Sequence, residues 1–248
     1  MPRFFVDIDQ INNGTVTING DDAHHISRSL RMAVGETVTV CDGRMEYECI
    51  LEGFSDNVTA RIVNSHVINC EMPCHVKLFQ ALPKGDKLDT IIQKAVECGV
   101  FEITTFESER CVVRSKSDSE DKKMERRSRI ALEAAKQCGR GIIPKVNKTI
   151  PFDRMLEIVS SGNDLVLFCY EGDGVRPLRE VLIGLGGREW AKGKDVAVVI
   201  GSEGGFSYDE AKRAEECGAI LVGLGNRILR TETASPFALA CLVYEFEL

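Results

Sequence analysis

Two glycine-rich segments near the C-terminus carry the residue types best suited to holding a ligand. Residues 201–205 read Gly-Ser-Glu-Gly-Gly after a short apolar run, and residues 223–225 read Gly-Leu-Gly after a second run. Glycine lets the backbone approach a ligand closely, because no side chain obstructs it. Short, β-branched apolar runs are typical of strands buried in a parallel sheet. We therefore expect a ligand site at the carboxyl ends of these strands, where open α/β sheets bind ligands.

The common phosphate-binding motifs do not fit these segments. Residues 201–205 lack the Lys-Ser/Thr pair of a P-loop and do not form Gly-x-Ser-x-Gly. Ile228 stands where a dinucleotide-binding fingerprint has its third glycine. A neutral or cationic ligand would suit the two loops as well as a phosphate. The residues alone therefore indicate an α/β domain with a nucleotide-like ligand.

The first 72 residues predict a small, mainly β unit. Alternating apolar runs separated by turn signals occur at residues 15–18, 37–40 and 58–63. A helix over residues 23–32, capped by Asp21 and Asp22, is expected to interrupt the strands. On it His25, Arg28 and Arg31 recur at three-residue spacing and can share one face. That face could grip phosphate or a base, although an ordinary solvated helix remains equally consistent with the pattern.

Residues 73–248 alternate between helical and strand patterns, which predicts a parallel sheet with right-handed crossovers. A charged segment at residues 117–121 predicts a mobile loop, and Ser207 is an expected N-cap for a helix that Gly218 closes. The expected strands are residues 75–82, 101–106, 165–170 and 196–200, and the expected helices are residues 89–98, 122–138, 152–160, 177–183 and 207–217.

Charge is distributed unevenly along the chain, whose net charge is −7. Residues 74–150 carry sixteen Lys and Arg against eleven Asp and Glu, whereas residues 1–73 carry five against eleven and residues 151–248 carry ten against sixteen. The basic middle segment could bind a polyanion, but a solvated helix face explains it as well. The acidic total argues against tight, indiscriminate binding to nucleic acid.

Ten cysteines without a Cys-x-x-Cys pair are typical of reduced thiols in a cytosolic protein. His66, Cys70, Cys74 and His75 lie close together in sequence, but their spacing matches no standard zinc site, so we predict no metal. No apolar run approaches the roughly 18 to 20 residues of a membrane span, and the N-terminus lacks the apolar core of a signal peptide. These features predict a cytoplasmic protein that does not interact with membranes.

The C-terminal segments resemble those of one enzyme superfamily. Residues 224–234, Leu-Gly-Asn-Arg-Ile-Leu-Arg-Thr-Glu-Thr-Ala, resemble the closing motif of the SPOUT, or trefoil-knot, RNA methyltransferases, and residues 200–206 resemble their preceding loop. Ser202 stands where proline is often found. The wider pattern resembles the RsmE family of 16S ribosomal RNA uridine N3-methyltransferases, through residues 24–26, 30–31, 93–100, 108–110 and 137–144.

This resemblance implies a fold that periodicity could not reveal. It implies a PUA-like β-barrel RNA-binding domain over residues 1–72, followed by a SPOUT α/β-knot methyltransferase domain with a parallel sheet over residues 73–248. It also implies a homodimer that binds S-adenosylmethionine. The cofactor-binding residues that the resemblance implies are Gly201, Glu203, Gly204, Gly205, Leu224, Ile228, Leu229, Thr231 and Ala234.

The same resemblance implies the chemistry of the site. Arg230 is the predicted catalytic residue, because a guanidinium beside the uracil oxygens would stabilise the anion formed when N3 loses its proton. Glu232 is a weaker candidate for the base, and an ion pair or helix cap explains it at least as well. The predicted RNA contacts are Arg3, His25 and Arg31 in the first domain and Lys84, Lys94 and Arg140 in the second.

The predicted partner is 16S ribosomal RNA or the small ribosomal subunit. Three alternatives stay open at this point. A non-catalytic RNA-binding ribosome-assembly factor would not need the cofactor, and a SPOUT methyltransferase could act on another RNA. An unrelated small-molecule α/β enzyme would need the glycine loops but not the β-barrel.

Overall fold

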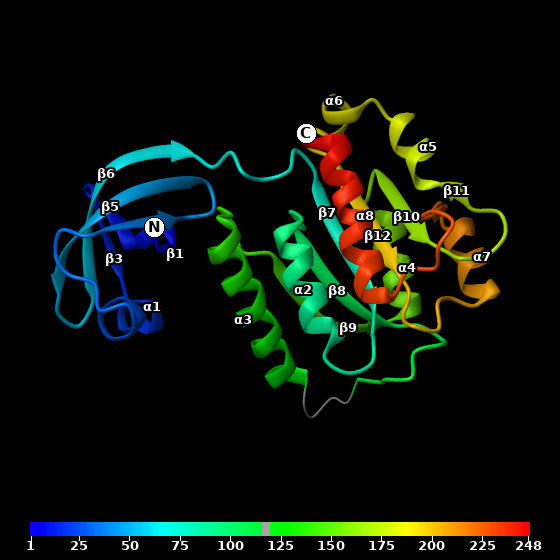
Figure 1. Cartoon of the computed structure of the whole chain (residues 1–248), viewed down its shortest axis with the longest axis horizontal. Helices are drawn as coiled ribbons and strands as arrows, with labels where there is room; N and C mark the ends of the chain where they lie inside the picture. The colour runs from blue at the N-terminus through cyan, green and yellow to red at the C-terminus, as the bar shows by residue number, and fades with distance from the viewer. Residues whose placement is uncertain (116–119) are drawn as a thin grey trace. The chain divides into compact units, whose positions relative to one another are not determined.

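The computed structural model describes residues 1–115 and 120–248, which form two compact units (Figure 1). The first unit comprises Met1–Glu71 together with Ala135–Ile143, and the second comprises Met72–Ala134 and Pro144–Leu248. The predicted domain boundary after residue 72 assigns residues 135–143 to the second domain, whereas in the structure this segment belongs to the first unit. Of the expected loop at residues 117–121, residues 117–119 lie outside the described part, and residues 120 and 121 begin a helix.

The first unit is built on a six-stranded sheet in the order β1-β4-β5-β6-β3-β2, in which only β1 and β4 pair in parallel. Alternate side chains such as Val16, Val38 and Leu51 are fully buried between the sheet and its helical segment, as the period-two pattern predicts. The strands are β1 (Arg3–Phe5), β2 (Ile11–Asn12), β3 (Thr15–Ile18), β4 (Thr37–Cys41), β5 (Met45–Phe54) and β6 (Val58–Val67).

The helix predicted over residues 23–32 begins and ends earlier than expected. A short 3-10 helix, η1 (Ile8–Gln10), precedes β2, and after β3 the chain forms α1 (Gly20–His24) and one π-helical segment, η2 (His25–Ser29). Asn19 is the N-cap, so the predicted capping by Asp21 and Asp22 is wrong. Arg31 adopts a left-handed conformation with φ 53°, which ends the helical path before residue 32.

The second unit contains a seven-stranded sheet in the order β11-β13-β10-β12-β7-β8-β9, and every neighbouring pair is parallel. The predicted parallel sheet is therefore confirmed. Its strands are β7 (His75–Ala81), β8 (Glu102–Glu107), β9 (Lys145–Pro151), β10 (Leu165–Cys169), β11 (Arg176–Pro177), β12 (Asp195–Ile200) and β13 (Ile220–Gly223).

Helices cover both faces of this sheet, which explains why its central strands are apolar on both sides. The helices are α2 (Lys87–Glu97), α3 (Glu120–Cys138, whose last turn belongs to the first unit), α4 (Phe152–Ser161), α5 (Leu178–Ile183), α6 (Gly187–Ala191), α7 (Tyr208–Glu216) and α8 (Thr231–Phe246). Within the described residues, no helix is both long and apolar enough to cross a bilayer.

The two faces of the sheet differ in what they bury. On one face α2 and α8 pack against each other in front of the sheet (Figure 1). The other face carries a cluster of aromatic rings in which Phe206 stacks on Phe106 and lies 4.2 Å, centroid to centroid, from Phe168. Phe206 comes directly after the first glycine segment, so this cluster anchors one end of that loop.

Candidate functional site

A cavity of about 780 Å³ lies at the carboxyl ends of β10, β12 and β13. The predicted location of a ligand site at these strand ends is therefore supported by the geometry. Arg230 lines the cavity, whereas Glu232 is not among its lining residues. The nine predicted cofactor-binding residues all line it: Gly201, Glu203, Gly204, Gly205, Leu224, Ile228, Leu229, Thr231 and Ala234.

The first glycine loop turns tightly as β12 ends. The N–H of Gly205 donates to the carbonyl of Ser202 at 3.0 Å, and Gly205 adopts φ 64°. A Cβ on Gly201 would lie 3.1 Å from the Gly205 Cα, so the turn leaves little room for a side chain there.

A capping box fixes the exit of this loop. Ser207 Oγ accepts from the Glu210 N–H at 3.3 Å, and the Glu210 carboxylate accepts from the Ser207 N–H at 3.0 Å. The predicted N-cap of α7 is thus confirmed, and Gly218, with φ 90°, follows the end of the helix.

A buried hydrogen-bond network joins the second glycine loop to the first. The Thr231 hydroxyl donates to the Gly201 carbonyl at 2.7 Å. The Gln80 amide donates to Thr231 Oγ1 at 3.0 Å and accepts from Ser235 Oγ at 2.5 Å. Gln80 and Ser235 are fully buried, so these polar groups can be satisfied only by one another and by nearby backbone. The network holds β7, β12 and α8 together directly beneath the cavity.

Lys87 brings two carboxylates of the site together. Its Nζ lies 2.8 Å from Glu203 Oε1 and 3.5 Å from Glu232 Oε2. The contact between Lys87 and Glu232 is an ion pair without a directed hydrogen bond. Glu232 Oε2 is buried and accepts no hydrogen bond from the residues described. This contact favours a role for Glu232 as an ion-pair partner over its predicted role as the base.

The ionisation of Glu203 follows from these contacts. Burial acts to raise the pKa of the Glu203 carboxyl, but hydrogen bonds from Lys87 and from backbone N–H groups outweigh it, and the net pKa lies below its usual value. The hydrogen bond to Glu203 is the main reason that the pKa of Lys87 is raised. The pair is therefore ionised at neutral pH and braces the first glycine loop against α2.

Three arginines that line the cavity have no carboxylate partner in the described part of the chain. For Arg110, Arg227 and Arg230, no carboxylate among the described residues lies within 4.0 Å of the guanidinium. All three residues are exposed. They give the mouth of the cavity a positive rim suited to an anionic ligand.

Several cavity residues were not predicted from the sequence. They come from the end of β10, from the start of α2, from the segment after β8 and from the rest of the two loops. The signal that could have found the first group is their position after an apolar strand, since the carboxyl ends of parallel strands share one edge of the sheet. The missed residues include Lys87, Arg110, Cys169, Tyr170, Glu171, Gly172, Val175, Tyr208, Asn226 and Arg227.

The predicted RNA contacts divide into exposed residues and residues with a structural environment. His25, Arg31 and Lys84 are exposed. Lys94 is exposed as well, but its Nζ lies 2.9 Å from both carboxylate oxygens of Glu97 on the same helix. These four positions remain predictions as RNA contacts.

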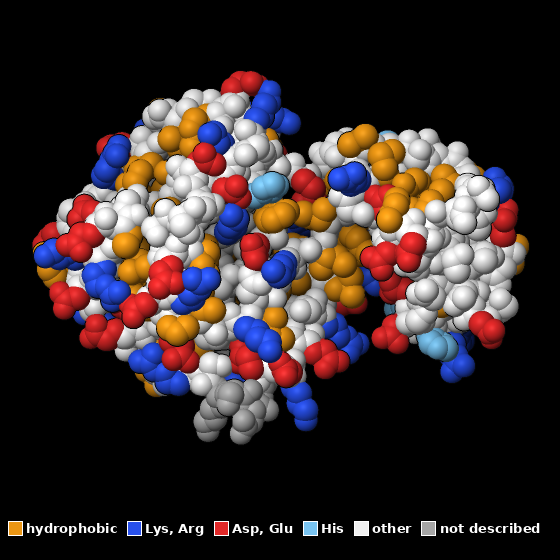
Figure 2. Space-filling model, turned by 180° about the vertical axis from the view of Figure 1, so that it is seen from behind, with side chains coloured by type: hydrophobic (Ala, Val, Ile, Leu, Met, Phe, Trp, Pro, Cys, Tyr) orange, Lys and Arg blue, Asp and Glu red, His pale blue; other side chains and the backbone are white. Residues whose placement is uncertain are grey.

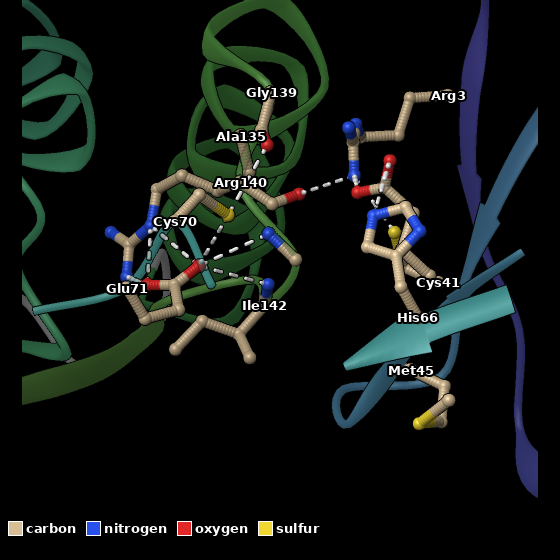
Figure 3. Close-up of polar contacts among 12 residues, drawn as sticks. Arg3, Cys41, Met45, His66, Cys70, Glu71, Ala135, Gly139, Arg140 and Ile142 are labelled. Atoms are coloured by element: carbon tan, nitrogen blue, oxygen red, sulfur yellow. Dashed lines mark hydrogen bonds and ion pairs between the residues drawn. The ribbon is translucent and has the colours of Figure 1, made fainter. Parts of the chain in front are cut away.

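Arg3 and Arg140 are engaged within the first unit (Figure 3). Arg3 Nη1 lies 2.7 Å from Glu46 Oε2 and 3.3 Å from the carbonyl of Arg140. Arg140 is only 4% exposed, and its Nη2 lies 2.5 Å from Glu71 Oε2. Glu71 also accepts from the backbone N–H of Gly141 at 3.0 Å. This arrangement argues against the predicted RNA role of both arginines and makes them supports for the returning segment 135–143.

The cysteine and histidine residues considered for zinc do not form a ligand set. No group of three or more His, Cys, Asp or Glu side chains that could hold a metal ion occurs in the described part of the chain. His66 instead lies 3.6 Å from Glu46, and the Cys70 thiol donates to the Gly139 carbonyl at 3.4 Å (Figure 3).

Comparison with known proteins identifies the family. A family model described as an RNA methyltransferase domain matches residues 70–243, and one described as an RNA methyltransferase PUA domain matches residues 18–62. The chain is 34% identical to Ribosomal RNA small subunit methyltransferase E of Bacillus subtilis over 257 aligned positions, covering 100% of this chain and 98% of that protein. The chain belongs to this family of RNA methyltransferases. The predicted family is thereby confirmed.

Solved structures agree with this assignment. The fold matches a Ribosomal RNA small subunit methyltransferase E from Neisseria gonorrhoeae bound to S-adenosyl methionine, with a TM-score of 0.83, 29% identity, and coverage of 99% of this chain and 98% of that chain. A methyltransferase from Legionella pneumophila in complex with the same cofactor matches with a TM-score of 0.83, 29% identity, and coverage of 98% and 96%. The predicted fold class, a SPOUT-type α/β domain preceded by a PUA-like unit, is confirmed.

Proposed function

We propose that this chain transfers the methyl group of S-adenosylmethionine to N3 of a uridine in 16S ribosomal RNA of the small subunit. The observation that carries the proposal is the glycine-lined cavity at the strand ends, in a chain that matches a ribosomal RNA small subunit methyltransferase along its whole length. We also propose a cytoplasmic location, which a ribosomal substrate supports.

The residues of the cavity fit this cofactor. Its volume lies within the roughly 300–1,000 Å³ of small-molecule sites. A Cβ on Gly205 or Gly225 would meet no atom within 4 Å, so the backbone of both loops is open to a close ligand there. Carboxylates at Glu171 and Glu203 line the cavity and suit the cofactor's positive ammonium and sulfonium groups. Backbone at Leu224, Ile228 and Leu229 would hold the cofactor from the opposite side.

The Gln80 network should set the affinity for S-adenosylmethionine, because it holds the two glycine loops in register. We expect Gln80→Leu to raise the Kd about tenfold, since Ser235 Oγ and the Ala81 carbonyl each lose a buried partner. Isothermal titration calorimetry measures this Kd. Gln93→Leu, on the exposed face of α2, is the matched control and should bind as the wild type does. A wild-type Kd for Gln80→Leu would contradict the role of the network.

The chain's tasks in the reaction are orientation and control of one proton. S-adenosylmethionine supplies a methyl carbon bound to a sulfonium, which leaves as a neutral thioether. The uracil N3–H must lose its proton before or during attack, and the N3–C bond forms as the C–S bond breaks. The Arg230 guanidinium would stabilise negative charge on the uracil oxygens. Glu232 is the member of the predicted pair that could accept the proton, although its ion pair with Lys87 supports a positioning role instead.

The decisive experiment is transfer of a labelled methyl group to purified small subunits and to free 16S ribosomal RNA. The expected product on nucleoside analysis is 3-methyluridine. Absence of cofactor binding and transfer would favour the non-catalytic assembly factor. Another labelled nucleoside, or labelling of a different RNA only, would favour a SPOUT enzyme of another specificity.

The RNA contacts proposed for this chain are separate exposed residues of both units. On the face of the molecule in Figure 2, Lys and Arg side chains are interspersed with Asp and Glu. His25 and Arg31 of the first unit, and Lys84 and Lys94 of the second, are the proposed positioning contacts.

We further propose that α8 mediates a homodimer. One side of the helix packs into the second unit, with Leu239, Leu242 and Phe246 buried, but the other side is also apolar. Phe237 is 42% exposed and Tyr244 is 74% exposed, seven residues apart on that second side. A helix that is apolar all round needs cover on both sides, and a second copy of the same face would provide it.

Replacing Tyr244 tests this interface. We expect Tyr244→Glu to run as a monomer in size-exclusion chromatography with light scattering, because each copy would bring an unpaired carboxylate into the apolar interface. Val63→Glu, at an exposed apolar site in the first unit, should remain dimeric. A monomeric wild type, or a dimeric Tyr244→Glu, would refute the proposed interface.

A further inference from the structure

Arg110 occupies a position that the proposed reaction has not yet used. It follows β8 in the segment 108–110, and its exposed side chain lines the cavity. Arg110 Nη1 donates to the carbonyl of Gly204 at 3.2 Å. A Cβ on Gly204 would lie 2.9 Å from the Arg110 Cβ and 3.1 Å from its carbonyl oxygen. The missing side chain at Gly204 is therefore what allows Arg110 to lie directly against the first glycine loop.

The backbone that carries Arg110 is fixed on both sides. The buried carboxylate of Glu210 accepts from the N–H of Glu109 at 2.7 Å. The Arg114 guanidinium donates to the carbonyls of Ser108 and Glu109 at 3.1 and 3.3 Å. Because Glu210 also belongs to the capping box of α7, the same carboxylate ties the Arg110 segment to the exit of the glycine loop. The guanidinium is thus presented from a preorganised support.

The Arg110 guanidinium has no carboxylate within 4.0 Å in residues 1–115 and 120–248. Five other arginines of the second unit do pair with carboxylates. With one hydrogen bond to Gly204, most of its five N–H donors are available to a ligand. The paired arginines of this unit are Arg114, Arg126, Arg127, Arg154 and Arg213.

We propose that Arg110 binds a backbone phosphodiester of the RNA beside the nucleotide that enters the cavity. A guanidinium fork matches two phosphate oxygens, and such a contact fixes the register of the strand without reading its sequence. The hydrogen bond to Gly204 links this phosphate contact to the loop that holds the cofactor. The proposal rests on the proposed function, and it makes Arg110 a positioning residue for the RNA.

Binding of in vitro transcribed 16S ribosomal RNA, measured by filter binding over a series of salt concentrations with S-adenosylhomocysteine present, tests this role. We expect Arg110→Ala to raise the Kd about tenfold and to make the salt dependence shallower by about one phosphate contact. Arg110→Lys should keep the salt dependence while losing part of the affinity, because it retains the charge without the fork. Arg154→Ala removes an exposed, ion-paired charge from α4 and should leave both quantities unchanged.

Arg110 could instead contact the carboxylate of the cofactor. The Kd for S-adenosylmethionine, measured by calorimetry, distinguishes this contact from a contact with an RNA phosphate. An unchanged cofactor Kd in Arg110→Ala is the expected result. A raised cofactor Kd with wild-type RNA binding would assign Arg110 to the cofactor and overturn the proposal. An unchanged RNA Kd and an unchanged salt dependence would overturn it as well.

Methyl transfer by the wild type is scored separately. If it fails, the proposed function fails, whereas if it succeeds and Arg110→Ala binds RNA normally, only the role of Arg110 fails. A wild type that binds neither this RNA nor purified small subunits overturns both.

Discussion

Arg230→Ala is expected to lower kcat for methyl transfer by about 100- to 1,000-fold, which is the usual loss when one donor to a developing oxyanion is removed. The backbone around Arg230 is fixed, because its carbonyl accepts from the N–H groups of Thr233 and Ala234 at 2.8 Å each at the start of α8. Its side chain lines the cavity and is exposed. The variant should therefore lose the guanidinium without losing the loop.

Two measurements distinguish a catalytic role from a structural one. The Kd for S-adenosylmethionine should stay within about twofold of the wild type, since the loss is confined to the transition state. Arg230→Lys should recover only part of the rate, because an ammonium cannot reproduce the planar fork. Arg154→Ala is the control for loss of a positive charge elsewhere in the second unit. Unchanged turnover in Arg230→Ala with normal cofactor binding would remove Arg230 from the mechanism.

Glu71→Ala is expected to destabilise the first unit by about 3–5 kcal/mol, because it breaks a largely buried pair between the Glu71 carboxylate and the Arg140 guanidinium. The Arg140 side chain is 5% exposed and that of Glu71 is 20% exposed, so solvent can replace little of the lost interaction. Glu71 also accepts from the backbone of Gly141 and Ile142, which ties the turn after α3 to the end of the first unit (Figure 3). Urea unfolding, followed separately for each unit's transition, measures the effect.

An exposed ion pair in the same unit provides the matched control for Glu71→Ala. Glu52 and Arg61 lie 2.7 Å apart with side chains 45% and 53% exposed, so Glu52→Ala should cost less than about 1 kcal/mol. The double variant Glu71→Ala/Arg140→Met removes the buried charge as well, and we expect it to recover part of the lost stability. Equal losses in Glu71→Ala and Glu52→Ala would show that the buried pair has no special weight.

Much of the local structure could be predicted from the sequence. The alternation at residues 15–18 and 37–40 depends on nearest neighbours along the strand, and the structure has strands there. Ser207 caps α7 because its hydroxyl reaches an N–H three residues away, a contact that short-range spacing encodes. The helix after Asn19 was misplaced because Arg31 adopts a left-handed conformation that residue type disfavours.

The electrostatic roles within the site could not be predicted in this way. Arg140 counted as a candidate RNA contact because its segment is basic, yet folding buries it against Glu71, 69 positions earlier. No role was predicted for Lys87 from the sequence, although its ammonium forms ion pairs with both Glu203 and Glu232. Charge and spacing show that a residue can bind an anion, but burial decides which anion it meets.

The sequence by itself determined the two glycine loops, their position after apolar strands and the family to which their motifs belong. These follow from local patterns, since carboxyl ends of parallel strands meet at one edge and only glycine permits the close backbone approach at Gly201. Tertiary structure alone decided how the loops are joined. Gln80 and Thr231 are 151 positions apart, and only the packing of α8 against the sheet places their side chains 3.0 Å from each other. No local pattern records such a distance, because it depends on how the whole second unit folds.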